Sequence, residues 1–383
     1  MSFSTLLNSG YKNKGLKNLT NVKNKKSIKA ISLLMAILFI TLSFSGCGKK
    51  TEDSSTTDTT KKAATTLPVT TEPATEVVAQ TPINPLTGEG NYPEELVGNR
   101  SVLVSVENHP QARPQWGICS ADIVWELLAE GGITRMLCMF ADASRLPDKL
   151  GPTRSARHYF VEIAEGFDSI FVHFGQSPKG KEYLNAYGTA NINGMYDGSA
   201  FSRDYSRNVD SEHTAYTTKN KIISAIDSKG YRTTAEDGKA EPFSFNAKAV
   251  SLPDGKCTSV SVPFSSDFTY KYTYDETNKV YLSSLNGTAF KDDNGKQQSF
   301  TNIIIVYAST TTIDSYGRIS YDLSSGDGVY VSNGTYQNIS WEKGDCTDIM
   351  KFTDEDGKEL KLNPGRSYIA LVPTKNQSQT TIS

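Results

Sequence analysis

The sequence of 383 residues lacks the motifs that mark several common enzyme classes. It has no GxSxG or HExxH motif and no phosphate-binding P-loop. It has only four histidines, His109, His158, His173 and His213, and their spacing matches no zinc-ligand pattern. We therefore predict no metal site and no cofactor. Whether the chain is an enzyme stays open at this stage.

Acidic residues are absent from the first 46 positions, which hold seven lysines. An uncharged apolar run from Ala30 to Phe44 follows the lysines, and Ser45, Gly46 and Cys47 come next. A basic start, an apolar centre and small residues before a cleavage point are typical of a secretory signal. Because the signal ends on a cysteine, residues 1–46 resemble a bacterial lipoprotein signal peptide. We expect Cys47 to carry the lipid that holds the protein on the extracytoplasmic face of the cell membrane.

The next segment, residues 47–83, has almost no residues that could form a core. Threonine and serine dominate it, with scattered prolines and charges. This composition predicts a disordered tether of roughly 29–35 Å root-mean-square span. Such a tether would hold a folded domain away from a membrane surface.

Removal of the signal peptide leaves an acidic chain, with a net charge of about −9. An acidic chain argues against nucleic acid as a partner. Four cysteines besides Cys47 remain, and outside the cytoplasm Cys119–Cys138 or Cys257–Cys346 could form disulfides. Cys138 lies inside the apolar run MLCMF, which favours a small buried side chain instead.

Residues 84–235 are expected to form an N-terminal α/β domain. Residues 100–107 alternate like a strand, and residues 122–140 read as two strands joined at Gly131 and Gly132. After the break at Gly151 and Pro152, apolar residues at helical spacing predict a helix that Thr153 or Ser155 caps and Gly166 ends. A strand at 170–174 and helices near 179–187 and 222–230 complete this domain.

Residues 240–375 predict a smaller, mostly antiparallel β domain, followed by a tail at 376–383. The fold class is therefore α+β. Expected strands fall at residues 247–252, 258–262, 268–274, 279–284, 301–308, 328–331, 337–341 and 367–372, with turn signals between many of them. Tyrosines in these strands could form a glycan- or protein-binding face, but cross-strand pairs that stabilise the sheets are the favoured interpretation. They are Tyr270, Tyr272, Tyr274, Tyr321, Tyr330 and Tyr336.

Arginines and a few other polar residues around the central helix are the candidate ligand-binding residues. Arg154 and Arg157 lie in or beside the first turn of that helix, where the dipole disfavours cations, so a negative group should lie nearby. Several arginine forks converging from separate segments would bind phosphate or carboxylate. The alternatives are an internal ion-pair network and a solvated surface. The candidates are Arg135, Arg154, Arg157, Arg203, Asp204, Arg207, His173 and His213.

Short motifs along the chain resemble the YerB-type lipoproteins of Gram-positive bacteria, a family of unknown function. The motifs are NPLTG at 84–88, NHP at 108–110, ARPQ at 112–115, EGGITR at 130–135, GPTRSAR at 151–157 and LNPG at 362–365. This chain departs from the family pattern at Glu107, at residues 212–214 and at Ser283. The resemblance implies an α/β domain followed by a smaller domain, and it assigns no catalytic residues.

The chain also has a weak similarity to the LytR-CpsA-Psr phosphotransferases. The similarity lies in the order of the elements: a strand pair that contains two glycines, an arginine in the next strand and an arginine-bearing segment after it. From these patterns we expect a lipoprotein that binds or scaffolds an anionic envelope glycan or lipid through an arginine-lined pocket. One alternative is an envelope enzyme that acts on a phosphorylated glycan or lipid carrier. The other is a protein–protein adaptor for cell-wall synthesis enzymes.

Overall fold

The computed structural model describes residues 81–383. The expected signal peptide, Cys47 and most of the expected tether lie outside these residues. Within 81–383, no helix has the length and apolar character needed to cross a membrane.

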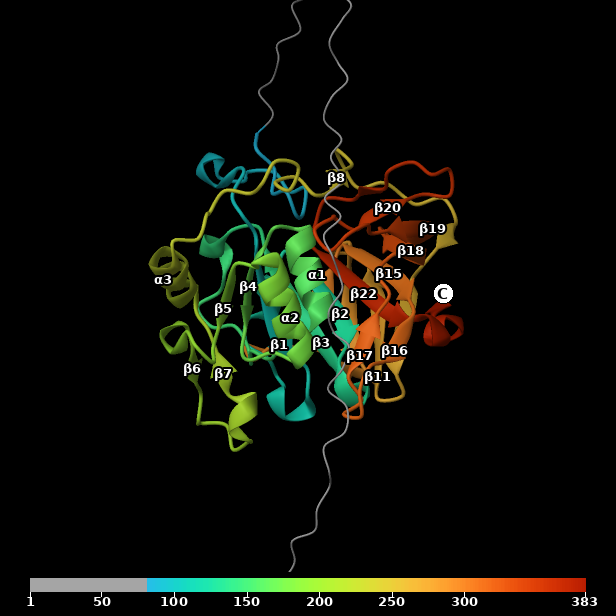
Figure 1. Ribbon diagram of the computed structural model, residues 1–383. Coiled ribbons are helices and arrows are strands. Elements are labelled where there is room, and N and C mark those ends of the chain that lie inside the picture. The colour runs from blue at the N-terminus through green and yellow to red at the C-terminus, as the bar shows by residue number, and fades with distance from the viewer. Residues whose placement is uncertain (1–80) are drawn as a thin grey trace, which may run out of the picture. The chain divides into compact units, whose positions relative to one another are not determined.

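A large mixed sheet forms the centre of the molecule (Figure 1). Its strands lie in the order β20-β19-β18-β15-β22-β2-β3-β1-β4-β5, and β9 pairs with β19 at one side. The strands from the first half of the chain are β1 (Val102–Glu107), β2 (Ile123–Leu128), β3 (Thr134–Phe140), β4 (Ile170–His173) and β5 (Asn191–Asn193). Those from the second half are β9 (Gly255–Lys256), β15 (Asn302–Ala308), β18 (Ser325–Ser332), β19 (Thr335–Glu342), β20 (Lys351–Thr353) and β22 (Ser367–Pro373).

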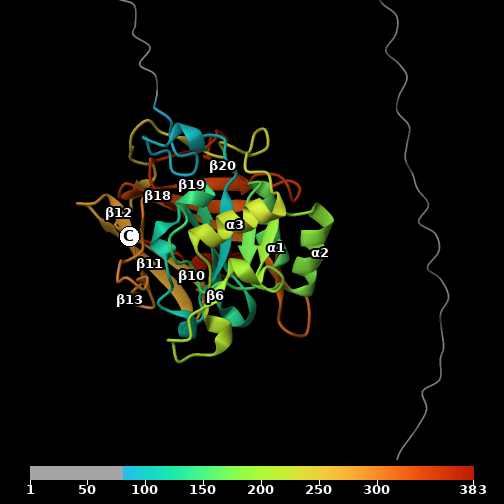
Figure 2. The ribbon, with the colours of Figure 1, turned by 90° about the vertical axis from the view of Figure 1, so that its left-hand side faces the viewer.

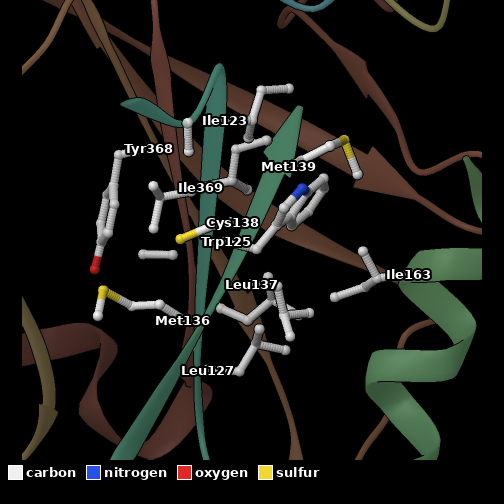
Figure 3. Packing of buried hydrophobic residues seen from close by; sticks show 14 of the residues in the cluster. Ile123, Trp125, Leu127, Met136, Leu137, Cys138, Met139, Ile163, Tyr368 and Ile369 are labelled. Atoms are coloured by element: carbon white, nitrogen blue, oxygen red, sulfur yellow. The ribbon is translucent and has the colours of Figure 1, made fainter. Parts of the chain in front are cut away.

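The central strands are apolar on both faces because both faces of the sheet are covered. Every residue of β1, β2, β3, β15 and β22 is buried. In Figure 3, Ile163 points toward Trp125 and Leu137 on one face, while Tyr368 and Met136 lie on the other. Continuous apolar runs of this kind are typical of strands covered on both sides.

Strand β22 joins the two halves of the chain within this sheet. It lies between β15 and β2 and is parallel to both. The predicted α+β class is confirmed, with a mixed sheet in the N-terminal part and mostly antiparallel strands in the C-terminal part. The sheet runs through both parts, and the domain boundaries at 84–235 and 240–375 stay predictions.

Two helices cover one face of the sheet, and a third lies beside β5 (Figure 1). They are α1 (His158–Gly166), α2 (Pro178–Tyr187) and α3 (Lys219–Lys229). Ser177 caps α2 and Thr218 caps α3 through their side chains, and Gly188 and Gly230 end these helices in the left-handed conformation. The predicted cap of α1 was wrong, because the helix begins at His158 and its N-cap residue is Arg157.

A second sheet of six strands covers the opposite face (Figure 2). Tyr270 and Tyr272 of β11 point inward, and the Tyr272 ring lies 4.8 Å from that of Tyr368 in β22. Tyr321 and Tyr330 are also buried, so these tyrosines stabilise the sheets. The strands are β10 (Ser259–Ser265), β11 (Phe268–Asp275), β12 (Val280–Leu285), β13 (Thr288–Ala289), β14 (Ser299–Phe300) and β23 (Thr381–Ile382).

The expected strand at 247–252 is absent from the structure, and that prediction was wrong. The side-chain amide of Asn363 accepts a hydrogen bond from Val250 N at 2.9 Å and donates one to Val250 O at 2.9 Å. Leu252 N donates to Thr335 Oγ1 at 2.7 Å. Side chains thus take the hydrogen bonds that a neighbouring strand would have taken.

The four cysteines in the described part of the chain are free thiols, and all are buried. Neither of the two possible disulfides is formed. Residues 374–382, which include most of the expected tail, form a short 3-10 helix at Thr374–Gln379 and then β23, which pairs with β10.

Three two-stranded ribbons complete the structure: β6 (Ser202–Arg203) with β7 (Ala215–Tyr216), β8 (Ser244–Phe245) with β21 (Lys361–Leu362), and β16 (Thr310–Thr312) with β17 (Ile319–Tyr321).

Candidate functional site

The candidate site lies where three parallel strands end. Strands β1, β4 and β5 run in the same direction, so their carboxyl ends meet at one edge of the sheet. Residues 152–156 run between the ends of β1 and β4 and hydrogen bond to both. Arg154 N donates to Ser105 O at 3.0 Å, and Phe174 N donates to Arg154 O at 3.0 Å. Ligands of open α/β sheets bind at such an edge.

A hollow of about 340 Å³ opens at this edge. Three groups of residues line it: the first belongs to residues 152–156, the second follows β4, and the third follows β5. Arg203, Glu212 and Ala215 close it from the β6–β7 ribbon and its connection. The lining residues from the three groups are Thr153, Arg154, Ser155, Phe174, Gly175, Gln176, Met195 and Tyr196.

Arg154 lies in the hollow between two carboxylates. Its Nε is 2.9 Å from Glu107 Oε1, and its Nη2 is 2.8 Å from Glu212 Oε2. Glu107 is buried, whereas the side chain of Glu212 is 54% exposed. The predicted negative group near Arg154 is therefore supplied by the protein itself.

Arg203 lies in the same hollow with a different set of partners. Its guanidinium group stands 4.8 Å from the centre of the Phe174 ring and donates hydrogen bonds to Ser211 O and Thr214 Oγ1. Among residues 81–383, no carboxylate lies within ion-pair distance of Arg203. Its positive charge is thus not neutralised by an acidic side chain in the described part of the protein.

His213 lies behind Glu212 and is buried. Its Nδ1 is 2.9 Å from Glu107 Oε2, and its Nε2 is 3.6 Å from Glu212 Oε1. The His109 ring stacks on it, with ring centres 4.6 Å apart and planes 6° from parallel. Both ring nitrogens of His213 therefore face carboxylates, and the hydrogen bond to Glu107 helps to fix the position of that carboxylate beside Arg154.

Arg135 and Arg157 support the wall of the hollow from behind. Arg157 makes a two-pronged ion pair with Glu130, with both N–O distances at 2.5 Å. Arg135 and Arg157 each donate to the carbonyl oxygen of Ser155, at 2.9 and 3.2 Å. Burial, reinforced by the charge of Arg157, lowers the pKa of Arg135 to about 9. Neither guanidinium group lines the hollow.

Asp204 and Arg207 do not line the hollow. Asp204 pairs with Lys149 at 2.5 Å, and hydrogen bonds from Lys149 and Ser206 hold the pKa of its carboxyl well below the ordinary value. Arg207 lies 3.7 Å from the centre of the Trp116 ring and 3.1 Å from Asp293. These contacts indicate that both residues hold loops in place.

His173, at the end of β4, is buried beneath the hollow. Its Nδ1 lies 2.8 Å from Gly175 O and its Nε2 lies 3.2 Å from Asn191 Oδ1. Burial lowers its pKa to about 4. The neutral ring carries a single N–H, so it donates to one of these two oxygens, and the whole ring is enclosed by the protein. Across residues 81–383, His, Cys, Asp and Glu form no group of three or more that could hold a metal ion.

Sequence reasoning missed the residues that follow β4 and β5. Asn193 Oδ1 accepts hydrogen bonds from Gly175 N at 2.9 Å and Met195 N at 3.1 Å, and its Nδ2 donates to Gln176 Oε1 at 2.6 Å. Asn193 thus fixes both loops that line the hollow. The available signal was the position of these residues just after parallel strands, but no strand was predicted at residues 191–193.

Comparisons with known proteins identify the family. Residues 86–232 match the family described as "Protein of unknown function (DUF3048) N-terminal domain", and residues 260–369 match its C-terminal domain. The chain is 38% identical over 296 residues to the "Putative lipoprotein YerB" of Bacillus subtilis (strain 168), covering 76% of this chain and 86% of that protein. The chain therefore belongs to the DUF3048 family, and the predicted resemblance to YerB is confirmed.

A solved structure gives the same result for the fold. The crystal structure of the YerB protein from Bacillus subtilis is similar to this chain with a TM-score of 0.68 and 36% sequence identity. The similarity covers 78% of this chain and 98% of that one.

Proposed function

We propose that this protein is a lipoprotein, anchored on the extracytoplasmic face of the cell membrane through Cys47, that binds an anionic envelope component in the hollow. The basic, apolar and cysteine-ended start of the sequence supports the anchor. So does the similarity to a protein described as a lipoprotein. The ligand is a glycan or a lipid headgroup that bears a carboxylate or a phosphate.

One observation carries the proposal for the ligand. Arg203 presents a guanidinium group to the hollow with no acidic partner among residues 81–383, beside the ion-paired Arg154. An arginine fork binds carboxylate or phosphate through charge-assisted hydrogen bonds. The hollow lies at the carboxyl ends of parallel strands, which is the usual place for a ligand in such a sheet.

The two alternative functions have less support. In an envelope enzyme, a histidine would need a nitrogen free to exchange a proton with the ligand, whereas both nitrogens of His213 face carboxylates. An adaptor would need a broad exposed apolar face, whereas Tyr270, Tyr272 and Tyr330 are buried.

The test is a binding measurement on residues 81–383, which contain the whole core described above. Phosphorylated envelope lipids and wall glycans would be titrated against the wild type and Arg203→Ala. We expect salt-sensitive binding that Arg203→Ala weakens roughly tenfold or more, the scale of a lost charged hydrogen bond. Arg318→Ala is the matched control, because Arg318 is half-buried like Arg203 and pairs with Asp314 outside the hollow. If the wild type bound none of these ligands, or Arg203→Ala bound them equally well, the proposal would be wrong.

A further inference from the structure

We infer that the ligand of the hollow is a saccharide that carries a single acidic group. This inference rests on the proposed function and narrows it, since it favours a sugar over a phospholipid headgroup or free phosphate. Three features of the hollow point to it: an exposed aromatic rim, a carboxylate within the site and an oriented amide.

The rim consists of Met195 and Tyr196, which follow β5. They are 62% and 73% exposed and line the hollow. The backbone beneath them is fixed, because Met195 N donates to Asn193 Oδ1 at 3.1 Å and Tyr196 N donates to Asn193 O at 2.8 Å. The rim is thus presented from a fixed turn. A pyranose ring has an apolar face of C–H groups that packs on such an aromatic ring, while its hydroxyls stay available for hydrogen bonds.

The carboxylate of Glu212 selects against a compact dianion. It lines the hollow, is 54% exposed and pairs with Arg154 through Oε2. A phosphate placed against Arg154 would meet this negative charge, which disfavours it. Sugar hydroxyls, in contrast, donate hydrogen bonds to a carboxylate. The one acidic group of the sugar would then lie at Arg203, which has no carboxylate within ion-pair distance in the described part of the chain.

Gln176 supplies donors of a third kind. Its Oε1 accepts a hydrogen bond from Asn193 Nδ2 at 2.6 Å, which directs its NH2 group away from Asn193. An amide held in this way can donate to a hydroxyl or ring oxygen of a sugar. The volume of about 340 Å³ is near the lower end of the range of about 300–1,000 Å³ for small-molecule sites. The site therefore suits one or two sugar rings better than an acyl chain.

The experiment titrates residues 81–383 with methyl β-glucuronide, methyl β-glucoside, inorganic phosphate and phosphatidylglycerol vesicles. Wild type, Arg203→Ala, Tyr196→Ala and Tyr316→Ala are compared by calorimetry or NMR. We expect the glucuronide to bind best. Tyr196→Ala should lower the affinity for the glucuronide roughly 3- to 10-fold, the scale of one aromatic contact. Tyr316→Ala is the matched control, since Tyr316 is 78% exposed on the connection between β16 and β17 and should leave binding unchanged.

The possible failures are distinguishable. If phosphate or the vesicles bound as tightly as the glucuronide and Arg203→Ala lost that binding, the saccharide inference would be wrong while the anion-binding function stood. Glucuronide binding that Tyr196→Ala left unchanged would also overturn the inference. If none of the four probes bound to the wild type, the proposed function would fail with it.

Discussion

Tyr368 donates its hydroxyl hydrogen to Glu126 Oε2 at 2.9 Å, and the two residues are 242 positions apart in the chain. The other oxygen of Glu126 accepts hydrogen bonds from Asn108 Nδ2 at 2.9 Å and Thr134 Oγ1 at 2.5 Å. This carboxyl is completely buried between the two sheets, and burial raises its pKa from 4.5 to about 7. It joins the N-terminal and C-terminal parts of the structure.

The raised pKa of Glu126 predicts a loss of stability as the pH rises. The folded protein keeps a proton on Glu126 that the unfolded chain releases above pH 4.5, so the free energy of unfolding should fall between pH 4.5 and about 7. The contribution of this group is on the order of 3 kcal/mol. Glu126→Gln mimics the protonated carboxyl and should remove that part of the slope, as measured by urea denaturation at pH 5 and 7.5. The exposed Glu94→Gln serves as control, and an unchanged slope in Glu126→Gln would contradict the assignment.

Arg157 is expected to support the fold rather than bind the ligand directly. Arg157→Ala leaves Glu130 without its ion-pair partner and removes one of the two donors to each of the Ser155 and Ala156 carbonyl oxygens, so it should lower the free energy of unfolding by roughly 2–4 kcal/mol. Denaturant unfolding measures this loss. Arg203→Ala, which breaks no ion pair among residues 81–383, should cost much less. Equal stability of the two variants would contradict this division of roles.

The thiols are expected to be unreactive in the folded protein. Burial raises the pKa of Cys119 and Cys346 to about 12 and that of Cys257 to about 11, and it also raises the pKa of Cys138. Because the thiolate is the reactive form, residues 81–383 should not react with Ellman's reagent at pH 8 until denatured, when all four thiols should react. A reducing agent should leave the melting temperature unchanged. Fewer than four thiols after denaturation would reveal a disulfide.

His158 and His173 are expected to stay neutral in the folded state down to about pH 5. Burial lowers the pKa of both to about 4, so the folded state binds fewer protons than the unfolded chain below pH 6.5. Their contribution to stability is therefore present above pH 6.5 and is lost as the pH falls toward 4. NMR titration of the ring protons gives the test, with the urea-unfolded chain as reference. Titration of His173 near pH 6.5 in the folded protein would contradict this, because it would show that the ring is not desolvated by burial.

Much of the fold followed from periodicity in the sequence. The two strands around Gly131 and Gly132, the helix ended by Gly230 and most strands of the C-terminal part were predicted, because turn residues and apolar spacing act locally. The start of α1 was missed, since residues 153–156 are held by backbone hydrogen bonds to β1 and β4, which are distant in sequence. The strand expected at 247–252 does not form for a similar reason. The backbone N–H and C=O of Val250 hydrogen bond to the side chain of Asn363, which is 113 residues away in the sequence.

The candidate site was predictable only in part. The arginine-rich segment was recognised, but sequence could not tell which guanidinium groups would meet internal acids. Arg157 meets Glu130, whereas Arg203 meets no carboxylate within residues 81–383. The loops after β4 and β5 contain no recognisable motif. Gln176 and Tyr196 were therefore identified as lining residues only from the structure, in which the parallel strands bring them to the same hollow as Arg154.

The position of β22 has a consequence for how the protein folds. This strand comes near the end of the chain, yet it fills the middle of the sheet between β15 and β2. Until it arrives, those two strands present open backbone edges that can pair with other chains. Closure of such a long loop is slow, because many contacts link residues far apart in sequence. Newly made protein should therefore be most prone to aggregation just before its last strands are added. A chain truncated before Ser367 lacks β22, so the edges of β15 and β2 should stay unpaired and the chain should remain prone to aggregation.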